Sequence, residues 1–99
     1  MPARTNTIVA GGDASATAAI AANGKRLGWS IQNQGTNVLF VKLGASASTT
    51  DYTFTLAAGT GSKNGTGGSV GQSGSGVWAG AISIAGTSPA YSHYELAED

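Results

Sequence analysis

Few side chains in this sequence could carry out chemistry, and His93 is the first of them. It is the single histidine, it lies among Tyr91, Tyr94 and Glu95, and the chain contains no cysteine. A general base or a metal site needs several converging groups, whereas the acidic residues are mostly far apart in the sequence. We therefore expect His93 and Tyr91 at a surface or interface, in a protein that is not an enzyme and uses no cofactor or metal.

The glycine-rich segment 57–76 is a candidate phosphate-binding loop, but its residues do not fit that role. Lys63 is followed by Asn64 instead of Ser or Thr, and further glycines stand where a P-loop requires a helix. The five basic residues are scattered and the formal net charge is zero. Because no basic stripe is available for a phosphate backbone, we expect no nucleic acid partner.

Trp29 and Trp78 could form an aromatic platform for a sugar ring. Both fall on the apolar side of an expected strand, so packing in the core is the favoured interpretation. Lys25 and Arg26 stand just before the clearest strand, and Arg26 falls on its polar side. We expect them in solvent or, within an assembly, against an acidic patch of a neighbour.

The elements that must position these residues are short strands. Apolar residues alternate with small or polar ones from Arg26 onward, which predicts a half-buried strand, and further strands are predicted at 38–43 and 52–56. Segment 14–22 fits a short helix capped by Asp13, or else a strand at about 17–22. We favour the strand, with Asn23 and Gly24 as a hairpin turn, because a helix there would have little to bury.

Other strands are expected at 5–10, from Val77 to about residue 85, and at 91–96. In the last of these, we expect Tyr94 and Leu96 to point inward, His93 and Glu95 to point outward, and residues 97–99 to fray. Six or seven short strands without a convincing helix indicate an all-β fold, either a small antiparallel β-sandwich or a jelly-roll-like barrel.

The whole chain, 1–99, is expected to form a single domain. Residues 1–12 suit an extended N-terminal arm, and segment 57–76 suits a flexible loop because it has too few large apolar groups to pack a core. No stretch resembles a signal peptide or a membrane span, so no membrane partner is expected. The core is small for the backbone entropy that folding must overcome, so burial against another chain would help.

Four stretches of the chain carry a resemblance to a known family. They are RLGWSIQN at 26–33, GTNVLFVKLG at 35–44, YTFTLAAG at 52–59 and WAGAISIAGT at 78–87. Together they resemble the R-x-x-x-x-I-x-N … L-[FY]-V-K-[LF]-G pattern of small virion proteins of tailed bacteriophages. The resemblance implies a β-rich subunit present in many copies on a capsid, such as a head decoration (cement) protein, and it carries over no functional residue.

The leading hypothesis is therefore a capsid decoration protein that contacts the major capsid protein and copies of itself, for example as a trimer. It would assemble in the host cytoplasm and lie on the capsid surface of the virion. The alternative is a tail or fibre component, or a glycan- or receptor-binding module in which Tyr91 and His93 contact sugar rings. The candidate interface residues are Arg4, Thr5, Ile8, Lys25, Arg26, Lys63, Tyr91 and His93.

Overall fold

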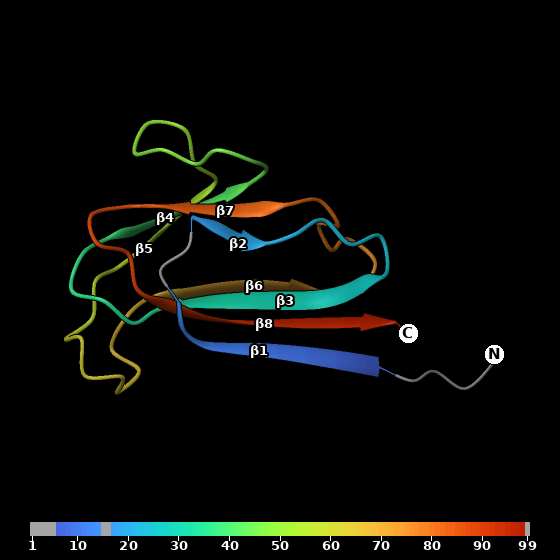
Figure 1. Ribbon diagram of the computed structural model, residues 1–99, viewed down its shortest axis with the longest axis horizontal. Helices are drawn as coiled ribbons and strands as arrows, with labels where there is room; N and C mark the ends of the chain where they lie inside the picture. Colours follow the sequence, from blue (N-terminus) through green and yellow to red (C-terminus); the bar gives the residue numbers. More distant parts are fainter. Residues whose placement is uncertain (1–5, 15–16, 99) are drawn as a thin grey trace.

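The computed structural model describes residues 6–14 and 17–98 of the chain. Every element in this part is a β-strand: β1 (Asn6–Ala14), β2 (Ala18–Ile20), β3 (Arg26–Asn33), β4 (Leu39–Leu43), β5 (Phe54–Leu56), β6 (Ser69–Ser73), β7 (Ile82–Ala85) and β8 (Tyr91–Glu98). Sheet A has the order β1-β8-β3-β6 and sheet B the order β2-β7-β4-β5, and all neighbouring strands are antiparallel. Figure 1 shows the two sheets as separate layers. The prediction of a small antiparallel β-sandwich is confirmed.

The hydrophobic core lies between the two sheets. Its buried members come from both layers and are Ile20, Trp29, Ile31, Leu39, Val41, Leu56, Ile82, Ile84 and Tyr91. The alternation of β3 places Trp29 and Ile31 on the inner face, as expected from the sequence, and both side chains are only 1% exposed. In sheet B the same rule turns Leu39 and Val41 inward and leaves Phe40 on the outer face.

Strand β2 lies within the segment that fitted either a helix or a strand, so the choice of a strand is confirmed. The hairpin predicted at Asn23 and Gly24 is wrong, because β2 belongs to sheet B and β3 to sheet A. The turn is nevertheless formed, since the Arg26 amide donates to the Asn23 carbonyl at 3.1 Å. It carries the chain from one sheet to the other.

Strand β6 lies inside the glycine-rich segment, where no strand was predicted. It pairs with β3 at the edge of sheet A, with Val70 opposite Ile31 and Gly71 opposite Ser30. A Cβ atom at Gly71 would lie 2.6 Å from the Trp29 carbonyl oxygen. The glycine therefore allows a close approach of the two backbones, and pairing with β3 creates a strand that its own side chains do not indicate.

Strand β7 begins later than predicted, and Trp78 precedes it. The indole of Trp78 is 38% exposed, so its assignment to the core is wrong. Its Nε1 donates to the Ala81 carbonyl at 2.9 Å. A Cβ atom at Gly80 would lie 2.5 Å from the indole Cζ2, so the ring packs on a glycine outside the core.

In strand β8, the residues predicted to point outward point into the core, and those predicted to point inward lie on the outer face. Tyr91 is only 1% exposed, and His93 stands opposite the buried Ile31, whereas Tyr94 stands opposite Ser30. Because paired residues in an antiparallel ladder share a face, His93 points inward and Tyr94 outward. The predicted fraying is also wrong for residues 97–98, which continue β8 and pair with β1.

Candidate interaction surfaces

Arg26, predicted in solvent or against a neighbour, is instead buried within its own chain. Its Nε lies 2.7 Å from Glu95 Oε2, and its side chain is 0% exposed. Nη1 donates to the carbonyls of Trp78 (2.7 Å) and Gly80 (2.9 Å), and Nη2 donates to the carbonyl of Ala21 (2.7 Å). The guanidinium therefore joins β8, the segment before β7 and the segment after β2, and we call this arrangement the Arg26 clamp.

A register shift explains why Arg26 points inward. Arg26 pairs with Ala97 and Gly28 pairs with Leu96, so Leu27 is an extra residue in β3. A bulge of this kind reverses the alternation on one side of it. Arg26 thus comes to the same face as Trp29, which strict alternation does not allow.

Tyr91 and His93 are not the exposed pair that the glycan hypothesis needs. Their rings pack at a centroid distance of 6.0 Å with a tilt of 54° on the inner face of sheet A. Burial raises the pKa of the Tyr91 phenol above its ordinary value of 10.0. His93 Nδ1 is buried and has no hydrogen-bond partner among the described residues. The assignment of Tyr91 to an outer interface is wrong for this fold.

The remaining predicted interface residues do not form one surface with these. Lys25 is exposed at the turn before β3, where its carbonyl accepts from the Glu98 amide at 2.9 Å. Lys63 is exposed in the loop between β5 and β6, with a positive φ of 57°. Ile8 lies in β1, opposite Leu96 of β8. Residues 4–5, Arg4 and Thr5, lie outside the described part of the chain.

Asn33 is a buried polar residue that the sequence reasoning did not single out. Its Nδ2 lies 2.8, 3.3 and 3.1 Å from the carbonyl oxygens of Asn37, Leu56 and Ala57, and its Oδ1 accepts from the Gly35 amide at 2.9 Å. It thereby links the end of β3 to the start of the glycine-rich segment. The sequence did contain a feature that could have indicated the importance of Asn33, because this residue is the asparagine of the R-x-x-x-x-I-x-N pattern.

The outer face of sheet B carries an aromatic pair, the half-buried Phe40 and the exposed Tyr52, which we call the sheet B patch. Their ring centroids are 5.1 Å apart with a tilt of 58°, and Tyr52 is 45% exposed. Beside the pair, Lys42 Nζ lies 2.6 Å from Asp51 Oδ2. The patch is therefore apolar at its centre, and the charges at its margin neutralise each other.

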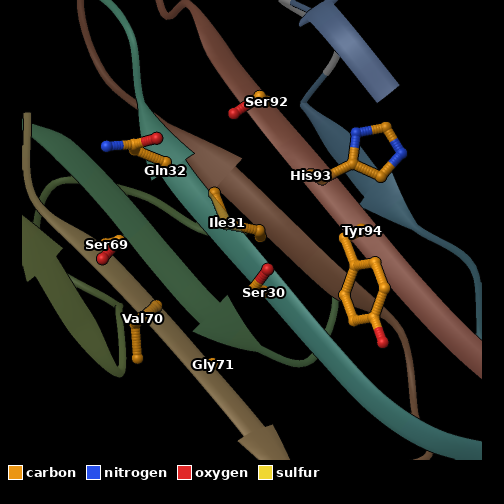
Figure 2. Close-up of a pocket in the computed structure, with 9 residues that line it drawn as sticks. All are labelled: Ser30, Ile31, Gln32, Ser69, Val70, Gly71, Ser92, His93 and Tyr94. Atoms are coloured by element: carbon orange, nitrogen blue, oxygen red, sulfur yellow. The ribbon is translucent and has the colours of Figure 1, made fainter. Parts of the chain in front are cut away.

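The outer face of sheet A carries a shallow groove of about 460 Å³ that crosses β6, β3 and β8 (Figure 2). Its outward-pointing residues follow from the register: Ser69, Gln32 and Ser92 form one row, and Gly71, Ser30 and Tyr94 form the next. Figure 2 shows the Tyr94 ring beside Ser30. We call this site the sheet A groove.

A second hollow, of about 490 Å³, lies between β2, β7 and the loop at 45–47. Its lining is mostly alanine and isoleucine. The Ser83 hydroxyl holds the loop in place, because it donates to the Gly44 carbonyl at 2.7 Å and accepts from the Ala47 amide at 2.9 Å. This hollow is apolar, in contrast to the sheet A groove.

The described residues contain no group of three or more His, Cys, Asp and Glu side chains that could hold a metal ion. The same part of the chain contains no helix with the length and apolar character needed to cross a membrane. Comparisons with protein-family models, with curated proteins and with solved structures find no match to this chain.

Proposed function

We propose that this protein is a non-enzymatic structural subunit that decorates the capsid of a tailed bacteriophage and stabilises the head. The sheet B patch is the observation that carries the proposal. Tyrosine and phenylalanine are enriched at the centres of protein interfaces, where a few aromatic residues supply most of the binding energy. Phe40 and Tyr52 form such a centre on the outside of a paired sheet.

The chemistry of the patch supports an apolar contact with the capsid. Lys42 and Asp51 satisfy each other at 2.6 Å, so they leave no net charge to attract a charged partner. The complementary surface on the partner should be uncharged and apolar, and we assign this surface to the major capsid protein. The flat shape of the chain, 44 × 28 × 19 Å, suits a subunit that lies on a shell and touches further copies of itself.

The resemblance to phage virion proteins supports the same proposal. Arg26, Ile31 and Asn33 match the R-x-x-x-x-I-x-N pattern, and all three are buried. The second half of the pattern, L-[FY]-V-K-[LF]-G, covers Phe40 of the sheet B patch and Lys42 at its margin. The resemblance therefore includes residues that hold the sandwich together and part of the proposed contact surface, which supports a shared structural role.

Sedimentation with capsids tests the proposal. Expanded capsids that lack this subunit, prepared from the phage that encodes it, are mixed with the purified chain. We expect the chain to cosediment and to follow the capsid lattice in electron cryomicroscopy. Tyr52→Ser is expected to weaken binding more than about tenfold, because loss of an interface hot spot costs about 2 kcal/mol or more.

Tyr94→Ser is the matched control, because it removes a tyrosine from the outer face of the other sheet, and it should bind like the unmodified chain. Absence of binding to capsids would overturn the proposal. Location of the chain on tails or fibres would also overturn it and would favour the alternative of a tail or fibre component.

A further inference from the structure

We propose that the sheet A groove binds a neutral carbohydrate, a function beyond the capsid contact assigned to the sheet B patch. In this site Tyr94 provides the stacking ring, and Ser30, Gln32 and Ser92 provide hydrogen bonds. The volume of about 460 Å³ lies within the range of about 300–1,000 Å³ that is typical of small-molecule sites.

The shape of the groove follows from small residues on one side and a large ring on the other. Gly71 and Ser30 form a low floor on β6 and β3, and Tyr94 stands beside them on β8 (Figure 2). The floor cannot easily be filled at Gly71, where a Cβ atom would lie 2.6 Å from the Trp29 carbonyl oxygen. An aromatic ring next to a low polar floor suits a sugar, whose C–H face stacks on the ring while its hydroxyls meet the floor.

The lining selects an uncharged ligand. Among the described residues, no Asp, Glu, Lys or Arg lines the groove. The nearby Glu95 pairs with Arg26 on the inner face of the sheet. A charged ligand would lose hydration without gaining a counter-charge, whereas serine and tyrosine hydroxyls both donate and accept and so match the hydroxyls of a sugar.

The polar groups at one end of the groove are already held in position. Gln34 Nε2 donates to Gln32 Oε1 at 3.2 Å and to Ser92 Oγ at 3.0 Å. These bonds orient the Gln32 amide and leave its Nε2 as a donor to a ligand. Groups that are ordered before binding lose less conformational entropy when the ligand arrives.

An NMR titration of the isotope-labelled chain tests the site. The probes are cellotriose, maltotriose and triacetylchitotriose, each added to about 10 mM, well above the dissociation constant of roughly 1 mM expected for a shallow site. We expect at least one probe to give saturable shifts of the amide signals of residues 30–32, 69–71 and 92–94.

Three substitutions at two positions in the groove and one control make the test specific. Tyr94→Ala is expected to weaken binding about tenfold, which corresponds to about 1.4 kcal/mol. Tyr94→Phe should keep most of the affinity because it retains the ring, and Ser30→Leu should abolish binding by filling the floor. Tyr52→Ala removes an exposed tyrosine from sheet B and should leave binding unchanged.

Three results would overturn the proposal. They are the absence of saturable shifts in the groove with all three probes, shifts that survive both Tyr94→Ala and Ser30→Leu, and shifts centred on the apolar hollow beside β2 and β7. If Tyr94→Ala fails to fold, Ser30→Leu decides the matter. The groove and the sheet B patch lie on opposite sheets, so failure of sugar binding and failure of capsid binding are separate results.

Discussion

Replacing Arg26 by methionine is expected to lower the free energy of unfolding by about 3–5 kcal/mol, the usual cost of removing one partner from a buried ion pair. The substitution leaves the Glu95 carboxylate, whose side chain is only 14% exposed, without its cation. It also removes the donor from three carbonyl groups that the guanidinium reaches at 2.7–2.9 Å. A methionine fills much of the same space, so the loss reports on the polar contacts.

Urea denaturation, followed by tryptophan fluorescence, measures this loss. Domains of this size have unfolding free energies of about 5–15 kcal/mol, so the variant should unfold at a clearly lower urea concentration with a similar slope. Arg26→Lys should recover only part of the loss, because an ammonium group cannot reproduce the planar fork of donors.

A double-mutant cycle isolates the ion pair from the carbonyl contacts. Arg26→Met combined with Glu95→Met should cost less than the sum of the two single substitutions, because neither charge then remains buried alone. Lys25→Met is the matched control, since Lys25 is the exposed neighbour, and it should change stability by no more than about 0.5 kcal/mol. A loss below about 1 kcal/mol for Arg26→Met would refute a stabilising role for the clamp.

Three further predictions concern the core and the glycine-rich segment. Trp29→Ala should cost about 3–5 kcal/mol in urea denaturation, because the indole is fully buried, and a loss below about 1 kcal/mol would contradict its place in the core. Gly67→Ala should destabilise the fold, because its Cβ would collide with the Asn33 carbonyl oxygen. A Cβ at Gly76 would meet no atom of the described residues within 4 Å, so Gly76→Ala should be nearly neutral in the same assay. The Tyr91 phenol should ionise above pH 10.0 in the folded chain, because burial raises its pKa. Its contribution to the free energy of unfolding is therefore complete below pH 10.0 and is lost as the pH rises through the higher folded pKa. The difference in phenolate absorbance between the unmodified chain and Tyr91→Phe measures this pKa, and ionisation at the ordinary pKa would contradict burial of the phenol.

The sequence-based predictions succeeded where local pattern decides structure. The bounds of strands β3 and β4 were predicted almost to the residue, because each is a run of mainly apolar residues of strand length that lies between turn residues. β6 was missed because its own side chains carry almost no strand signal, and its pairing with β3 defines it. The two tryptophans also show that local pattern does not decide burial, since both fall in an apolar pattern and only Trp29 is buried.

The candidate sites were harder to predict, because they depend on which face of a strand is outward. Both faces of β8 carry aromatic residues, so the alternation alone could not choose between Tyr91 and Tyr94 for the outer surface. The same uncertainty placed His93 outside, although it stands opposite the buried Ile31. The only sequence feature that indicated the sheet B patch was the presence of apolar residues on both faces of β4.

The amino-acid sequence by itself determined that residues 6–14 and 17–98 form short strands and no helix, because side-chain alternation and turn residues act over a few neighbouring positions. Only the tertiary structure decided what those strands bury and display. Arg26 and Glu95 are 69 positions apart, and a one-residue bulge brings them to the same face. Such contacts depend on the pairing of distant strands, where a shift of one residue exchanges the inside of a sheet for its outside.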